Sequence, residues 1–148
     1  TINNNNIVNV TVNPIGQENL EYVTCEVLKR ILNNTSSDSE FMAKTLEYIH
    51  AHESHPENHN IIYRNRRSNV ALVKKNDIFE YEDVDQAVNI AVSNWLDNVA
   101  LTDRYDELPK RIKERYEEVG EDDRSTNSMI KTRIYTNSKR TEQRCIKK

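Results

Sequence analysis

The chain has 148 residues, of which 36% are hydrophobic, and a formal net charge of −3. This length suits one ordinary domain with a modest core, and no apolar run approaches the roughly 18 residues that a membrane span needs. Cys25 and Cys145 are too few and too distant for a disulfide framework or a zinc finger, so a reducing compartment is expected. Because the first residue is Thr1, we expect the chain to begin inside a longer protein.

Residues 1–16 form an asparagine-rich arm. The β-branched run from Ile7 to Val12 predicts a strand, and Pro14 and Gly16 predict the turn that ends it. A lone strand is not stable in water, so this one is expected to pair with the body of the domain or with its copy in another subunit. The second arrangement predicts a homo-oligomer.

Two short helical patterns begin the body of the domain. Thr24 is a suitable N-cap for a helix over 25–33, whose apolar residues recur at helical spacing. Ser39 is a suitable N-cap for a second helix over 40–51. Pro56 then prevents helical continuation, so an irregular junction is predicted before the next elements.

Three short runs at 60–63, 70–73 and 78–81 follow this junction and predict an antiparallel meander. Asp83 and Gln86 have the spacing of a capping box, which marks the start of a helix. That helix should pack on the meander through an apolar stripe at helical spacing. The stripe comprises Val84, Val88, Val92, Trp95 and Val99.

A last helix is predicted over 109–119 and ends before Gly120. The predicted fold class over 17–120 is therefore α+β, a small antiparallel meander covered by helices. Residues 121–148 contain few large apolar side chains and are predicted to be a mostly disordered basic tail. A short ordered segment within this tail is expected at Ile130, Ile134 and Tyr135.

Charge is distributed unevenly along the chain. Residues 124–148 carry eight Lys or Arg and one Glu, which leaves 13 basic and 23 acidic residues in 1–123. A basic tail and a basic hairpin are compatible with contact to DNA or RNA. The alternative is that these charges are only solvated or protect a sheet edge. The candidate nucleic-acid-binding residues are Arg64, Arg66, Arg67, Lys74, Lys75, Lys139, Arg140 and Arg144.

All four histidines lie between residues 50 and 59. Three of them, His50, His55 and His59, together with Glu57, offer ligands of the kind that bind zinc or another divalent ion. A metal-dependent nuclease would use one histidine to activate water, with Asn58 or Asn60 orienting a metal ligand. These residues are therefore a candidate metal site.

The same segment has an architectural interpretation, which we favour. Side-chain hydrogen bonds from carboxylate and amide groups can satisfy the loose backbone groups where a helix stops and a strand starts. On this interpretation the segment needs no cofactor. The residues of this structural junction are His55, Pro56, Glu57, Asn58 and Asn60.

The chain resembles an uncharacterised domain of giant (nucleocytoplasmic large DNA) virus proteins, of the mimivirus-like and phycodnavirus-like groups. The resemblance rests on three segments in order: Gly16-Gln17-Glu18-Asn19-Leu20-Glu21-Tyr22-Val23-Thr24, then Ile49-His50, then His55-Pro56-Glu57-Asn58-His59-Asn60-Ile61. The run from Asn76 to Asp83 is similar to the aromatic strand that ends the family's meander, with Phe79 at the usual Trp position. Over roughly residues 2–120, the resemblance implies a viral origin and a shared fold.

Members of that family often carry the domain after a zinc finger, in proteins taken to bind nucleic acid. The resemblance therefore implies a location in the host cytoplasm, at the virus factory, or in the virion. We predict a non-enzymatic interaction and assembly module, self-associating and in contact with nucleic acid, with no membrane partner. Two alternatives stay open: a metal-dependent nuclease built on His50–His59, and a virion structural component whose basic tail reaches the genome or other virion proteins.

Overall fold

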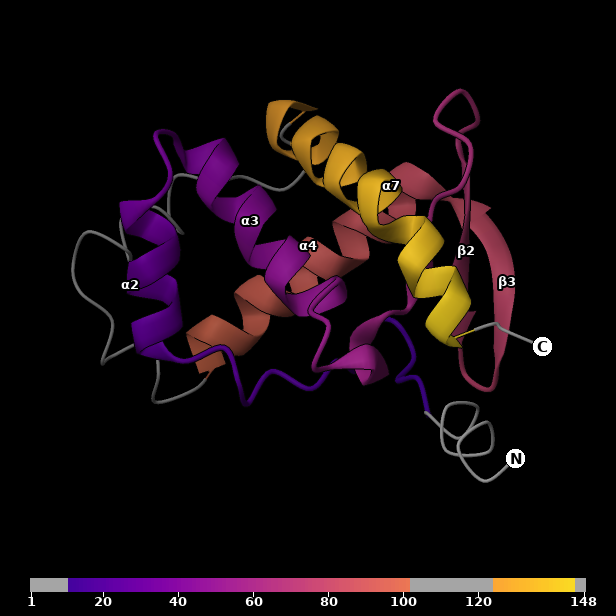
Figure 1. Ribbon diagram of the computed structural model, residues 1–148, viewed down its shortest axis with the longest axis horizontal. Coiled ribbons are helices and arrows are strands. Elements are labelled where there is room, and N and C mark those ends of the chain that lie inside the picture. Colours follow the sequence, from indigo (N-terminus) through magenta and orange to yellow (C-terminus); the bar gives the residue numbers. More distant parts are fainter. Residues whose placement is uncertain (1–10, 102–123, 146–148) are drawn as a thin grey trace.

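The structure, a computed structural model, describes residues 11–101 and 124–145 (Figure 1). The fold of these residues is α+β, as predicted, with helices packed beside a three-stranded antiparallel sheet. None of the described helices is both long and apolar enough to cross a membrane. In chain order the elements are α2 (Cys25–Asn33), α3 (Asp38–His50), the 3-10 turn η1 (Pro56–Asn58), β1 (Ile61–Ile62), β2 (Val70–Lys75), β3 (Ile78–Asp83), α4 (Val84–Leu101) and α7 (Arg124–Cys145).

Hydroxyl side chains cap the first two helices. Thr24 accepts a hydrogen bond from a backbone N–H of the first turn of α2, which begins and ends where the sequence predicts. Helix α3 starts two residues earlier than predicted, because the Ser37 hydroxyl accepts the Glu40 N–H at 3.1 Å. The predicted cap, Ser39, lies inside the first turn of α3.

The predicted meander is confirmed, with β2 in the centre of the sheet order β1-β2-β3. The turn between β2 and β3 places Asn76 at a φ of 53°, a left-handed conformation that asparagine tolerates better than most residues. On β2, Ala71 and Val73 point into the core and are 2% and 0% exposed. Strand β3 forms an outer edge of the sheet, at the right in Figure 1.

Helix α4 follows β3 without a loop. The Asp83 carboxylate accepts the backbone N–H groups of Asp85 at 2.9 Å and Gln86 at 3.1 Å, so the predicted helix start is confirmed. Helix α4 contacts both β2 and β3, as its stripe predicts. The residues of α4 that are buried among the described side chains are Val84, Ala87, Val88, Ala91, Val92 and Trp95.

The prediction of a mostly disordered segment over 121–148 is wrong for residues 124–145. These residues form α7, which packs along α3 and beside β1 (Figure 1). The helix buries Ile130 and Ile134, which are 1% and 6% exposed, in the same core as α3 and α4. The basic segment is therefore part of the packed domain over these residues.

Polar side chains hold both ends of the buried face of α7. The Thr126 hydroxyl donates to the Ser39 hydroxyl at 3.0 Å, and the Ser138 hydroxyl accepts the Tyr63 backbone N–H at 2.7 Å. Thr126 and Ser138 are both buried and lie four residues before and after the two isoleucines. Because the buried stripe has hydroxyl side chains at its ends, the sequence of this segment does not show a continuous apolar stripe at helical spacing.

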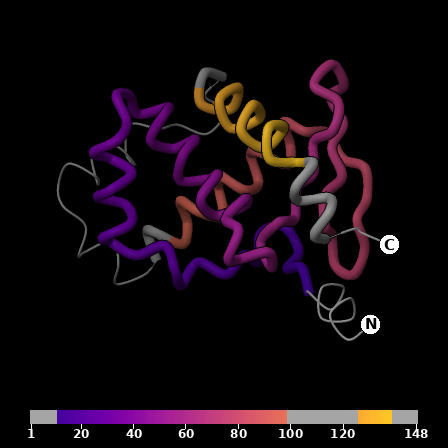
Figure 2. The backbone as a smooth tube through the Cα atoms, in the orientation of Figure 1, coloured from indigo at the N-terminus to yellow at the C-terminus, as the bar shows by residue number. Residues whose placement is uncertain are grey.

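Residues 11–24 run along one side of the molecule, from the sheet to α2 (Figure 2). The Asn13 N–H donates to the Glu57 carbonyl at 2.7 Å, and the Ile15 N–H donates to the Lys74 carbonyl at 2.9 Å. The segment is thereby fixed to both η1 and the end of β2.

Several predictions concern residues outside the described ranges. The predicted strand from Ile7 to Val12 lies mostly among them, so its pairing with another subunit stays a prediction. The predicted helix over 109–119 also lies outside the described residues.

Candidate functional site

The turn η1 is built around the side chain of Asn58, which is 0% exposed. Its amide nitrogen donates to the Asn19 carbonyl at 2.6 Å and to the Tyr22 hydroxyl at 2.8 Å. Its amide oxygen accepts the Asn19 backbone N–H at 2.8 Å. One side chain thus satisfies three groups on a segment 36 to 39 residues earlier in the chain.

A second set of contacts joins Glu57 and His55 to the same segment. The Glu57 carboxylate accepts the Asn19 amide at 3.1 Å and lies 3.0 Å from Nδ1 of His55. The His55 ring stacks on Tyr22 with centroids 3.6 Å apart and an interplanar angle of 2°. The Tyr22 hydroxyl donates to the Ile49 carbonyl at 2.8 Å, at the end of α3. The ring of Tyr22 therefore lies between η1 and α3.

A third set centres on the Glu18 carboxylate. It accepts the Asn60 side-chain amide at 2.6 Å, the Gly16 N–H at 2.9 Å and the Asn94 side-chain amide at 2.8 Å. The Asn60 amide oxygen lies 2.8 Å from Nδ1 of His50, which is 3% exposed. The Glu18 carboxylate therefore joins the N-terminal segment to α4 and to Asn60, the residue before β1, and Asn60 in turn contacts the end of α3.

The four imidazoles do not converge on one point. His50 contacts Asn60, His55 stacks on Tyr22, and His59 places Nε2 2.7 Å from the His52 carbonyl. No group of three or more His, Cys, Asp or Glu suited to a metal ion occurs in the part of the chain that the structure describes. The side-chain hydrogen bonds of Glu57, Asn58 and Asn60 are of the kind that the architectural interpretation predicts. The candidate metal ligands His50, His55, His59 and Glu57 are not brought to one point in the described part of the chain, so a metal site there stays a prediction.

Burial acts to raise the pKa of Glu57, but the hydrogen bonds from Asn19 and His55 outweigh it and hold that pKa below the usual 4.5. A carboxyl whose pKa is lowered in the folded state stabilises the fold above its unfolded pKa, and this stability is lost as pH falls through the folded pKa. We therefore expect wild-type protein to lose more unfolding free energy between about pH 6 and about pH 3 than Glu57→Gln does. Urea titrations at both pH values test this, with the exposed Glu21→Gln as a control that behaves like wild type.

A different part of the molecule gathers positive charge. Residues 64–69, within the loop between β1 and β2, expose the side chains of Arg64, Arg66 and Arg67 and project from the sheet at the upper right of Figure 1. We call residues 64–69 the arginine loop. Beside the loop a pocket of about 140 Å³ is lined by Tyr63, Arg66, Ser128, Lys131 and Thr132. The pocket brings a cation of the loop and a cation of α7 to one place.

The other predicted nucleic-acid-binding residues lie elsewhere. Lys74 and Lys75 end β2, at the opposite end of that strand from the arginine loop. Lys74 donates to the Asp77 carbonyl at 2.8 Å, and Lys75 forms an ion pair with Glu82. Lys139, Arg140 and Arg144 belong to the C-terminal half of α7. The structure therefore places Arg66 of the loop beside Lys131 of α7, and it places the two lysines of β2 at the other end of the strand.

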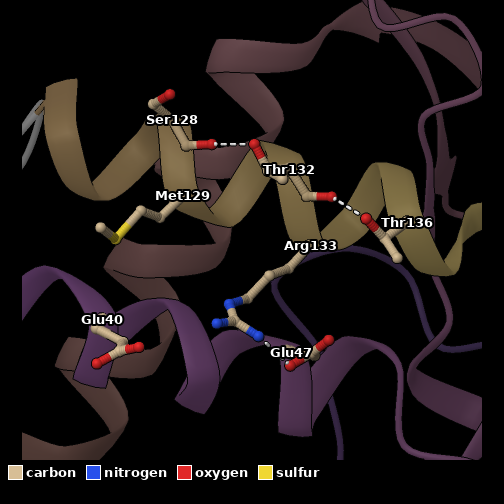
Figure 3. A pocket seen from close by; sticks show the side chains of 7 residues that line it. All are labelled: Glu40, Glu47, Ser128, Met129, Thr132, Arg133 and Thr136. Atoms are coloured by element: carbon tan, nitrogen blue, oxygen red, sulfur yellow. Dashed lines mark hydrogen bonds and ion pairs between the residues drawn. The ribbon is translucent and has the colours of Figure 1, made fainter. Parts of the chain in front are cut away.

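A groove of about 400 Å³ lies between α3 and α7 (Figure 3). Arg133 reaches from α7 to the Glu47 carboxylate on α3 at 2.8 Å, and Asn137 donates to the same carboxylate at 2.9 Å. The hydroxyls of Thr132 and Thr136 donate to carbonyls one turn earlier in α7. Since these polar groups bond within the fold, the groove has the character of a helix-packing seam.

Sequence reasoning missed several residues of both regions. The sequence assigns no role to Glu18, Asn19 or Tyr22, although all three lie in the segment that carries the family resemblance. Lys131 was not separated from the other basic residues of the tail. If residues 124–145 are taken as a helix, Lys131 lies next to the buried Ile130 and Ile134, at the edge of the packed face. This spacing is the signal that identifies Lys131.

Comparisons of the chain with protein-family models, with curated proteins and with solved structures gave no match. The resemblance to the giant-virus domain therefore stays a prediction from the sequence.

Proposed function

We propose that this domain is a non-enzymatic module that binds nucleic acid through the arginine loop and the adjacent face of α7. The observation that supports the proposal best is the pocket between them, where Arg66 and Lys131 face one polar space with the hydroxyls of Ser128 and Thr132. Guanidinium, ammonium and hydroxyl groups are the side chains that most often contact phosphate oxygens.

The loop arginines suit contact with a polyanion. Arg64, Arg66 and Arg67 are exposed on a projecting loop, so a nucleic-acid backbone can approach them without rearrangement of the core. Lys131 pairs with Asp85 at 2.8 Å, and the Asp85 side chain is 51% exposed. An ion pair of this exposure contributes only about 0–1 kcal/mol, so a phosphate group can compete with the aspartate for Lys131.

We propose a non-enzymatic function because titratable groups of the histidine-rich junction form hydrogen bonds that hold the fold together. Nδ1 of His50 lies against Asn60 and Nδ1 of His55 lies against Glu57, whose carboxylate also accepts the Asn19 side-chain amide. Recruiting these groups as a metal site or a general base would require breaking contacts that join α3, η1 and the N-terminal segment. We therefore place the functional surface at the arginine loop.

The experiment is a titration of the full chain into a fluorescently labelled oligonucleotide, followed by anisotropy at several salt concentrations. We expect Kd to rise with salt, because displacement of counterions supplies much of the affinity. Arg66→Ala and Arg67→Ala should each weaken binding about three- to tenfold and reduce the salt slope by about one.

Lys29→Ala is the matched control, since Lys29 is an exposed cation of α2 that pairs only weakly with Glu26 at 3.8 Å. This variant should bind like wild type. The proposal is wrong if no binding is detected at about 50 mM salt, or if Lys29→Ala weakens binding as much as the loop variants do.

A further inference from the structure

Among the described residues, one face of the sheet is exposed beside the arginine loop. The strand register places Leu72 opposite Tyr81 and Lys74 opposite Phe79 on this face, and Val70 opposite Asp83. We call these six residues of β2 and β3 the outer face. Tyr81 is 72% exposed and Val70 is 42% exposed. Two aromatic rings and two aliphatic side chains therefore form a surface that begins where the arginine loop ends.

We propose that the outer face binds single-stranded nucleic acid, with bases stacked on Tyr81 and Phe79 and phosphates held by the arginine loop. The inference rests on the proposed function and names the form of nucleic acid that it recognises. Aromatic side chains on an exposed sheet, next to cations, are the combination by which proteins bind unpaired bases.

The spacing of the two rings suits consecutive unpaired bases. Residues 79 and 81 lie on the same side of β3, about 7 Å apart, because side chains two residues apart in a strand share a face. Adjacent bases of a single strand can open to this separation, whereas bases in a duplex are stacked on each other and present no face to a protein ring. The two aromatic rings therefore favour binding of single-stranded nucleic acid over binding of a duplex.

Charge along the outer face is compatible with this ligand. The arginine loop lies at the Val70 end, and Lys74 lies at the other end with Nζ 5.7 Å from the centroid of the Phe79 ring. Because cations lie at both ends of the outer face, a short single-stranded oligonucleotide can lie across the aromatic rings while these cations neutralise its phosphates.

The acidic residues of β3 do not oppose this placement. Asp83 shares the outer face, but its carboxylate accepts two backbone N–H groups at the start of α4. Glu80 and Glu82 alternate with the two aromatic residues and so point to the other side of the strand, where Glu82 pairs with Lys75. The exposed Tyr81 ring, the half-buried Phe79 ring and the cations of the arginine loop are therefore the groups nearest to a bound nucleic-acid strand.

The test compares anisotropy titrations of the full chain with a labelled single strand of about 12 nucleotides, as DNA and as RNA, and with a duplex of the same length. We expect tighter binding of a single strand than of the duplex. Tyr81→Ala should weaken single-strand binding about tenfold, and Tyr81→Phe should retain most of it, because stacking needs the ring and not the hydroxyl. Tyr81→Ala should leave duplex binding unchanged.

Ile78→Ala is the matched control, because Ile78 is an exposed apolar residue of the same strand, at 60%, whose side chain points to the other face. It should bind like wild type. The melting temperature of each variant shows that folding is intact, which is expected at positions so exposed.

Three results would overturn the inference, and they are distinguishable. If the duplex binds at least as tightly and only the loop variants weaken binding, the inference is wrong and the proposed function stands. If neither form binds at low salt, both are wrong. If Tyr81→Ala abolishes self-association in sedimentation and leaves nucleic-acid affinity unchanged, the outer face pairs with a second copy of the chain and the inference is wrong.

Discussion

Asn58→Ala is expected to lower the free energy of unfolding by about 3 kcal/mol or more. Truncation leaves the backbone N–H and carbonyl of Asn19 and the hydroxyl of Tyr22 without the amide that pairs with them at 2.6 to 2.8 Å. Each polar group that is left unsatisfied in a buried position costs about 1–3 kcal/mol. Chemical denaturation of the variant measures the sum directly.

Asn69→Ala is the matched control, since this asparagine side chain is exposed in the arginine loop. It should change stability by less than about 0.5 kcal/mol. A double-mutant cycle of Asn58→Ala with Tyr22→Phe should give a coupling of about 0.5–3 kcal/mol, because the two side chains share a hydrogen bond. A near-neutral Asn58→Ala would show that η1 is not held by this side chain.

Ile130→Ala is expected to destabilise the protein by about 2–5 kcal/mol. The side chain is 1% exposed and belongs to the same core as α3 and α4, so its removal leaves a cavity among packed residues. The effect depends on α7 being an integral part of the domain. Thermal and chemical unfolding, followed by the circular dichroism of the helices, measure it.

Met129→Ala supplies the comparison, because Met129 precedes Ile130 in α7 and is 40% exposed. Its truncation should cost less than about 0.5 kcal/mol. Equal stabilities of the two variants, or an Ile130→Ala protein as stable as wild type, would mean that α7 does not pack on the core in solution.

Elements with strong local signals were predictable from the sequence. Helix α2 begins after Thr24 because a hydroxyl accepts a first-turn N–H, and its apolar residues repeat at helical spacing. The meander and the start of α4 at Asp83 follow from short β-branched runs and from a carboxylate placed to accept two N–H groups. In each case the interactions that form the element lie within a few residues of one another.

Helix α7 was missed because its buried face is not apolar throughout. Thr126 and Ser138 occupy the ends of the stripe and are satisfied by Ser39 and by the Tyr63 backbone, partners that lie 87 and 75 residues away in the chain. A periodicity search on the sequence detects the spacing of hydrophobic side chains. It does not detect buried hydroxyl groups whose hydrogen-bond partners lie far away in the chain. The many charged residues of the segment then favour a prediction of disorder.

The sequence predicts a structural junction at His55–Asn60, but it does not predict which residues the junction contacts. The sequence assigns a structural role to Asn58 and Asn60 from their place after a helix, since amides often satisfy loose backbone groups there. That the partners are Asn19, Tyr22 and Glu18 depends on the path of residues 11–24 along the side of the molecule (Figure 2). No local pattern encodes that path.

The most direct measurement is the hydrogen-exchange footprint of a bound oligonucleotide on the full chain. Backbone amides of the arginine loop and of β2 and β3 should exchange more slowly when a single strand of about 12 nucleotides is bound, while the histidine-rich segment 50–60 should exchange at an unchanged rate. Slower exchange confined to 50–60 would place the functional surface at the histidines and contradict the assignment of that segment to architecture alone.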